Sequence, residues 1–190
     1  LCVLFSFVST NSLWSKRIPT PFLKKPFEFI IGFRRSWLLL VLTNAIAIIG
    51  LFYANQNLAL FCMFCICICS TFYYHEVEPI LIFWNQNREP TEFLAYKMKR
   101  GTFQLSFLLV PLIVVQIILF PDDAHKPLII WGLGILLIPF MISLKYSAFP
   151  EKVGISEAVV VALCLSFYPL ILAVIPYYYV KAIANLKKLL

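Results

Sequence analysis

One short basic and aromatic stretch orients the whole chain: Pro21-Phe22-Leu23-Lys24-Lys25-Pro26-Phe27-Glu28-Phe29-Ile30-Ile31-Gly32-Phe33-Arg34-Arg35-Ser36-Trp37. Pro26 suits the first turn of a helix, where its missing N–H costs no hydrogen bond. At 100° per residue, Lys25, Glu28 and Arg35 gather on one side of that helix, and the aromatic and aliphatic residues gather on the other. The pattern predicts an interfacial helix over 21–36 that lies in a membrane surface, with Trp37 where the next segment enters hydrocarbon.

The composition is that of a membrane protein. Of the 190 residues, 62% are hydrophobic and 13% are charged, and the mean hydropathy is +0.89, whereas a soluble domain is close to half apolar and a quarter charged. The segments 37–74, 102–120, 127–144 and 158–180 contain no Asp, Glu, Lys or Arg. Because a charge at the centre of a bilayer costs roughly 2.5–3.5 kcal/mol, these segments are expected to cross hydrocarbon.

Turn signals separate the apolar segments from one another. The pattern predicts an all-α, polytopic helical membrane protein with a single transmembrane domain over 1–190. Complete spans of about 17–25 residues are predicted at 37–54, 58–74, 102–120, 128–144 and 158–180. A cytoplasmic helical loop is predicted over 75–101, with a helix over 88–101 that begins near Pro90 and ends at Gly101. The apolar run 1–13 is too short to span alone, which predicts the end of a truncated span whose first half precedes Leu1.

The distribution of Lys and Arg predicts which side faces the cytoplasm. With the stretch 21–37 inside and five alternating spans, the inner loops hold 12 of the 16 basic residues and the outer segments hold 4, as the positive-inside rule requires. This arrangement leaves the tail with Lys181, Lys187 and Lys188 outside. The alternative is that 158–180 breaks at Pro169 into two half-helices, which returns the tail to the cytoplasmic side.

Several polar or sulfur-bearing groups could in principle form a metal site. Cys62, Cys65 and Cys69 fall on one helical face, but their span carries no carboxylate or imidazole to complete a site, so they are interpreted as packing residues. The set His75, Glu76 and Glu78 is interpreted as a solvated helix end, and the set Asp122, Asp123 and His125 as a polar loop.

The sequence contains no Walker-type glycine loop, no Gly-x-Ser-x-Gly elbow and no His-Glu-x-x-His motif. We therefore predict no catalytic, cofactor-binding or metal-binding residues and no enzymatic activity. The net charge of +7 is clustered beside apolar spans, which favours anionic lipid as the partner and excludes nucleic acid.

Two charged helices on the predicted cytoplasmic side, 21–37 and 88–101, are of the kind through which a membrane subunit receives force from a soluble ATPase. The residues predicted to form this coupling surface are Lys24, Lys25, Glu28, Arg34, Arg35, Glu89, Glu92, Lys97, Lys99 and Arg100. Pro111 and Pro169 are the expected kinks. A transport path would be lined by Thr43, Asn44, Ser106, Gln116 and Ser166 together with aromatic residues, which favours an amphipathic cargo over an ion.

Five short strings carry a resemblance to a known family. They are Ile18-Pro19-Thr20-Pro21-Phe22, Lys25-Pro26-Phe27-Glu28-Phe29 with Gly32-Phe33-Arg34, Phe93-Leu94 with Lys97, Lys145-Tyr146-Ser147-Ala148-Phe149-Pro150, and Ile175-Pro176-Tyr177-Tyr178. In this order they resemble the C-terminal half of a family of uncharacterised bacterial integral membrane proteins, often labelled permease-like components of ABC transporters. The resemblance implies a multi-pass protein of the bacterial inner membrane and a permease role by analogy.

We therefore expect a permease-type membrane subunit of an ATP-driven transporter, which works with a separate ATPase. Its further partners would be the lipid bilayer and either the missing N-terminal half of the same protein or a homo- or hetero-oligomer. The alternative is a membrane scaffold or assembly subunit that transports nothing and binds a partner through its cytoplasmic loops. A membrane-embedded enzyme is the third and least favoured interpretation.

Overall fold

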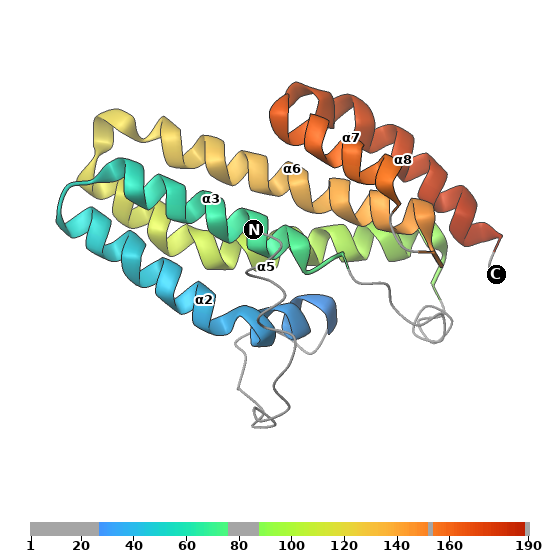
Figure 1. The fold of residues 1–190 in the computed structure, drawn as a ribbon, viewed down its shortest axis with the longest axis horizontal. Helices are drawn as coiled ribbons and strands as arrows, with labels where there is room; N and C mark the ends of the chain where they lie inside the picture. The colour runs from blue at the N-terminus through green and yellow to red at the C-terminus, as the bar shows by residue number, and fades with distance from the viewer. Residues whose placement is uncertain (1–26, 76–87, 152–153, 189–190) are drawn as a thin grey trace.

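The computed structural model describes residues 27–75, 88–151 and 154–188, and all regular secondary structure in these ranges is helical. Four helices, α2, α3, α5 and α6, run side by side in an elongated bundle, and a hairpin of α7 and α8 packs against the second half of α6 (Figure 1). Buried aliphatic residues such as Leu105 and Leu109 on α5 and Ile138 and Ile142 on α6 form its core.

Helices α2 and α3 pack side by side as a hairpin, in the place of the predicted spans 37–54 and 58–74, but α2 begins well before its predicted boundary. Helix α2 runs without a break over Phe27–Phe52, and α3 covers Gln56–Phe72. The predicted change from a surface helix to a separate span at Trp37 is therefore wrong within 27–52, because nothing in this segment interrupts the backbone hydrogen bonds. The turn itself is confirmed: the side chain of Asn55 caps α3 by accepting a hydrogen bond from the backbone N of Leu58 at 3.2 Å.

Helix α5 covers Pro90–Leu119, so the predicted cytoplasmic helix over 88–101 and the predicted span over 102–120 form one helix. Gly101 does not end it. A Cβ atom at Gly101 would lie 2.6 Å from Tyr74 Oη and 2.7 Å from Ile138 Cγ2. The glycine therefore serves close packing in the middle of the helix, where its propensity cost of about 1 kcal/mol is tolerated.

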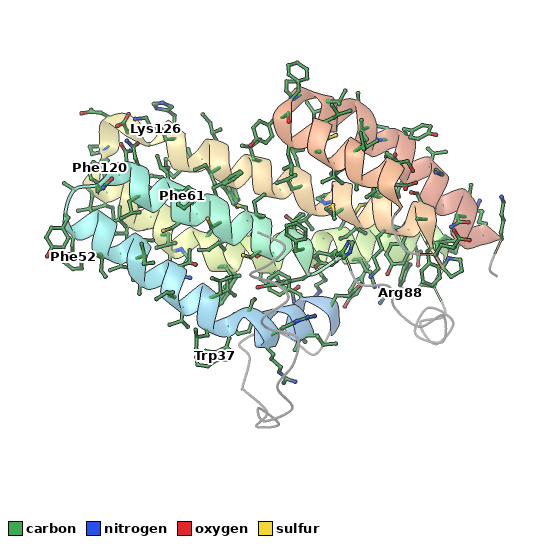
Figure 2. All side chains as sticks on the ribbon, viewed as in Figure 1. Trp37, Phe52, Phe61, Arg88, Phe120 and Lys126 are labelled. Carbon is green, nitrogen blue, oxygen red and sulfur yellow. The ribbon has the colours of Figure 1, made fainter. Side chains whose placement is uncertain are left out.

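A short 3-10 turn, η2 (Pro121–Asp123), connects α5 to α6 (His125–Ala148). This turn and the α2–α3 turn lie at one end of the bundle, here called the turn end (Figure 1). The opposite end, here called the charged end, holds the start of α2, the start of α5 and the end of α6. Among the Lys and Arg residues that the structure describes, Lys126 alone lies at the turn end, whereas Arg88 marks the charged end (Figure 2).

The predicted fifth span over 158–180 is broken. Helix α7 covers Ile155–Ser166 and α8 covers Pro169–Lys187, so the break falls directly before Pro169, as the alternative expected. Near its C-terminus, α8 is held against α6 because Asn185 Nδ2 donates to the backbone carbonyls of Phe149 and, at 3.3 Å, of Tyr146. The tail of the described chain therefore lies at the charged end.

Four helical segments are long and apolar enough to cross a membrane: Glu28–Phe52, Pro90–Leu119, Pro121–Ala148 and Pro169–Lys187. This is one fewer than the five complete spans predicted, because α3 has only 17 residues. The last predicted span is interrupted, but α8 takes its place in the count. The outside of the bundle is apolar: Leu38, Phe52, Phe61, Phe103 and Ile118 each expose more than half of their surface. An exterior of this kind is unusual for a monomeric soluble protein.

Candidate functional site

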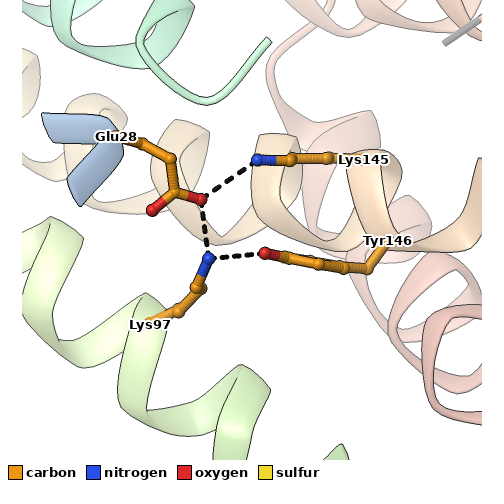
Figure 3. Close-up of polar contacts among 4 residues, drawn as sticks. All are labelled: Glu28, Lys97, Lys145 and Tyr146. Carbon is orange, nitrogen blue, oxygen red and sulfur yellow. Dashed lines mark hydrogen bonds and ion pairs between the residues drawn. The ribbon is translucent and has the colours of Figure 1, made fainter. Parts of the chain in front are cut away.

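Three helices that are far apart in sequence bring four polar side chains together at the charged end. Glu28 comes from the first turn of α2, Lys97 from α5, and Lys145 and Tyr146 from the end of α6 (Figure 3). We call these four residues the ion cluster. Glu28 is separated from Lys97 by 69 positions and from Lys145 by 117.

One carboxylate oxygen is the centre of the ion cluster. Glu28 Oε1 accepts a hydrogen bond from Lys97 Nζ at 2.7 Å and another from Lys145 Nζ at 3.0 Å. Lys97 Nζ also donates to Tyr146 Oη at 2.5 Å. The carboxylate therefore bridges two ammonium groups, and the phenol extends the network along α6 (Figure 3).

These charges are removed from water. Lys97 and Lys145 expose 1% of their surface and Glu28 exposes 7%. A buried charge that loses its partner is strongly unfavourable, whereas a charge that keeps well-placed hydrogen bonds is tolerated. Glu28 is the carboxylate that both ammonium groups share, so its removal takes an ion-pair partner from each lysine.

Aromatic rings surround the excess positive charge. Lys97 Nζ lies 5.0 Å from the centroid of the Phe93 ring and 5.1 Å from that of Tyr146, and Lys145 Nζ lies 5.4 Å from the Tyr146 ring. The rings of Phe93 and Tyr146 are themselves edge to face, with centroids 5.3 Å apart. The Phe93 ring attracts the Lys97 ammonium at this distance, whereas Tyr146 contacts Lys97 through its hydroxyl, and both contacts compensate part of the lost hydration.

Local sequence explains each position. Glu28 lies in the first turn of α2 and Lys145 in the last turn of α6, so each charge is favourable at its helix end. Lys97 follows Phe93 by four residues on α5, and both are buried on the side of α5 that faces the bundle. The arrangement joins α2, α5 and α6 through one carboxylate and one phenol.

The structure divides the predicted coupling surface. Lys24 and Lys25 lie outside the described residues. Glu28 and Lys97 are buried in the ion cluster, so neither side chain can contribute to an exposed docking surface. The remaining residues are exposed or partly exposed: Arg34, Arg35, Glu89, Glu92, Lys99 and Arg100.

On α5 the exposed charges surround an aromatic ring. The Arg88 guanidinium carbon lies 4.3 Å from the centroid of the Tyr96 ring, and that of Arg100 lies 5.6 Å from it. Glu92 and Lys99 are exposed on neighbouring turns of the same helix. We call Arg88, Glu89, Glu92, Tyr96, Lys99 and Arg100 the α5 surface.

Of the residues predicted to line a path, Ser106 contacts an aromatic residue: its Oγ accepts a hydrogen bond from Trp131 Nε1 at 3.0 Å. Within the described ranges, no hydrogen bond joins any two of the five side chains predicted to line a path; Thr43, Asn44 and Ser166 each donate to a carbonyl four residues earlier in their own helix. Glu76 and Glu78 lie outside the described residues, and Asp123 Oδ1 pairs with Lys126 Nζ at 2.9 Å. Among the residues that could be searched, no group of three His, Cys, Asp or Glu side chains could hold a metal ion.

Sequence reasoning did not identify Lys145 and Tyr146 as site residues. Lys145 and Tyr146 belong to one of the strings that carry the family resemblance, and Glu28 and Lys97 each belong to another. The resemblance implies no role for any of these four residues. Comparison of the chain with protein-family models, curated proteins and solved structures finds no match.

Proposed function

We propose that the chain is a multi-pass protein of the bacterial inner membrane and acts as a permease-type subunit that works with a separate ATPase. The observation that carries the proposal is the continuity of α5, which runs from the exposed α5 surface, past the ion cluster, to the turn end. A force applied to the α5 surface would therefore be passed along one continuous helix to its membrane-facing part, which contains Pro111.

The length of α5 supports a placement partly outside the lipid. Its 30 residues correspond to about 45 Å at 1.5 Å per residue, whereas the hydrocarbon core is about 30 Å thick. About ten residues can therefore project beyond hydrocarbon. The first eleven residues of α5 carry its acidic and basic side chains, and none follows from Gly101 to Leu119.

The ion cluster supports coupling between helices. Lys97 connects α5 to α2 through Glu28 and to α6 through Tyr146, and Gly101 brings α5 into close contact with α6 one turn later. A movement of the first turns of α5 would thus displace three helices together. Coupling of this kind needs a contiguous packed network, which these contacts provide.

The scaffold interpretation remains the second candidate, and the same ion cluster favours it. Buried ion pairs fix one arrangement of helices, which also suits a protein whose role is to hold a partner at the membrane. The two interpretations differ in whether ATP hydrolysis by a bound partner depends on this chain.

The topology of the proposal predicts the location of two reporters. A reporter inserted between Asp122 and Asp123 is expected on the periplasmic side, and a reporter fused after Leu190 on the cytoplasmic side, because α7 and α8 return the tail to the charged end. The measurement is the activity of side-specific reporter enzymes in intact cells. Reporters found on the same side would contradict this topology.

The coupling role predicts the effect of reversing two exposed charges. The double variant Lys99→Glu and Arg100→Glu is expected to reduce copurification of the ATPase by at least tenfold, or about 1.4 kcal/mol of binding free energy, while insertion in the membrane is unchanged. Lys97 is left intact because it is buried. The readouts are mass spectrometry of the purified complex and its rate of ATP hydrolysis.

The matched control exchanges the same two residues, Lys99→Arg and Arg100→Lys, which keeps both charges and is expected to retain the ATPase. Equal recovery with the charge-reversed and charge-conserved variants would contradict the role of the α5 surface. If no ATPase copurifies with the wild-type protein, that result would favour the scaffold interpretation.

A further inference from the structure

A cleft of about 490 Å³ opens at the charged end, between the end of α6, the first turn of α7 and the second half of α8. Its volume is in the range of ligand-binding pockets. Polar and charged residues line most of it: Ser147, Glu151, Ser156, Glu157, Lys181 and Asn185. None of these residues belongs to the ion cluster or the α5 surface.

Two opposite charges face this cleft from different helices without pairing. Glu157 Oε2 is held by Ser156 Oγ at 2.9 Å and by the backbone N of Gly154 at 3.0 Å. Lys181 Nζ lies 5.7 Å from the Tyr178 ring and forms no ion pair with a carboxylate in the described ranges. Each side chain can therefore still take an external partner.

Glu157 is in its charged form near neutral pH. The hydrogen bond from Ser156, together with backbone donors and the positive charge of Lys181, holds the pKa of Glu157 below its usual value. The cleft therefore presents one negatively charged side chain, Glu157, and one positively charged side chain, Lys181. Each lies a few residues from the end of its helix that borders the cleft.

The surface beside the cleft is apolar. Val159 and Leu163 on α7 are 53% and 55% exposed, and Tyr177 and Val180 on α8 are each 65% exposed. A ligand that satisfied both surfaces would combine a zwitterionic polar group with hydrocarbon chains. A phospholipid in the cytoplasmic leaflet has this chemistry.

We propose that the cleft binds the headgroup of a phospholipid of the phosphatidylethanolamine class, with its phosphate on Lys181 and its ammonium on Glu157. The ammonium N–H groups can donate to the carboxylate, whereas the quaternary nitrogen of phosphatidylcholine cannot. Phosphatidylglycerol has no cation, so Glu157 and Glu151 would repel it. The inference rests on the membrane location proposed above and is independent of any ATPase.

The test uses the full chain purified in detergent and titrated with each of the three lipids, with binding measured by native mass spectrometry. Wild-type protein is expected to bind phosphatidylethanolamine about tenfold more tightly than phosphatidylcholine or phosphatidylglycerol, which corresponds to about 1.4 kcal/mol. Glu157→Gln is expected to abolish the preference over phosphatidylcholine while its amide keeps the contact to Gly154. Lys181→Gln is expected to weaken binding of both phosphatidylethanolamine and phosphatidylglycerol.

Lys187→Gln is the matched control, since Lys187 is exposed on the same helix and does not line the cleft; its lipid preference should equal that of the wild type. Equal binding of the three lipids by the wild type, or an unchanged preference in both cleft variants, would overturn the proposal. Soluble glycerophosphoethanolamine that binds as tightly as the lipid would show a headgroup site that does not need a membrane. Release of the wild type from membranes by alkaline carbonate would overturn the membrane location itself.

Discussion

Replacing Glu28 by Ala is expected to lower the free energy of unfolding by about 3–5 kcal/mol, because it leaves two buried ammonium groups without the carboxylate that they share. The measurement is the unfolding transition of the purified protein in mixed micelles. Glu92→Ala is the matched control: Glu92 is exposed on α5, and a surface substitution of this kind changes stability by about 0.5 kcal/mol or less.

A triple variant separates the electrostatic cause from loss of packing. Glu28→Met, Lys97→Met and Lys145→Met together remove all three charges and keep much of the side-chain volume. Its stability is expected to lie closer to the wild type than that of Glu28→Ala, because apolar replacement of a complete buried ion network is often nearly neutral. A triple variant less stable than Glu28→Ala, or equal effects of Glu28→Ala and Glu92→Ala, would contradict this account of the ion cluster.

The second large effect is expected at Gly32. A Cβ atom there would lie 2.3 Å from both Cγ and Cδ1 of Tyr73 and 2.7 Å from its Cβ. Tyr73 is 7% exposed, and its hydroxyl is hydrogen-bonded to Ser36 Oγ. Because the clash reaches the base of the Tyr73 side chain, rotation of the ring cannot relieve it, and Gly32→Ala is expected to destabilise the protein by about 1–3 kcal/mol.

Gly132→Ala is the control for that prediction. It makes the same change within a helix, but no atom lies within 4 Å of the added Cβ, so only helix propensity acts, and a gain of up to about 1 kcal/mol is expected. Both variants are compared by their thermal unfolding in detergent. A Gly32→Ala protein as stable as Gly132→Ala would show that α2 and the end of α3 do not approach as closely as described.

The all-helical architecture of the described residues could be predicted from sequence, because long apolar segments separated by polar turns leave few alternatives. The boundaries at Trp37 and Gly101 could not. Both were placed where charged residues give way to apolar ones, but a change in composition does not end a helix unless the backbone also loses its hydrogen bonds. Pro169 does remove a donor, and the predicted break at that position is present.

The ion cluster was beyond sequence reasoning for a different reason. Its charges belong to three helices, and no periodic pattern relates positions 28, 97 and 145. Lys97 was assigned to the coupling surface together with Lys99 and Arg100, because all three belong to the charged segment 88–101. The spacing does indicate that Lys97 is buried: it lies four residues after Phe93 and four before Gly101, on the stripe that α5 buries.

The arrangement of the turns has a consequence for biogenesis in the proposed membrane setting. For the four helices α2, α3, α5 and α6, only two compact connections would have to be translocated, one at Tyr53–Asn55 and one at Pro121–Ala124. The basic residue next to the second connection, Lys126, already has its charge balanced by Asp123. Helices α2 and α3 could therefore enter the bilayer as one preformed pair, and α5 and α6 as another. The transfer of polar residues across hydrocarbon, which most limits insertion, would then be small.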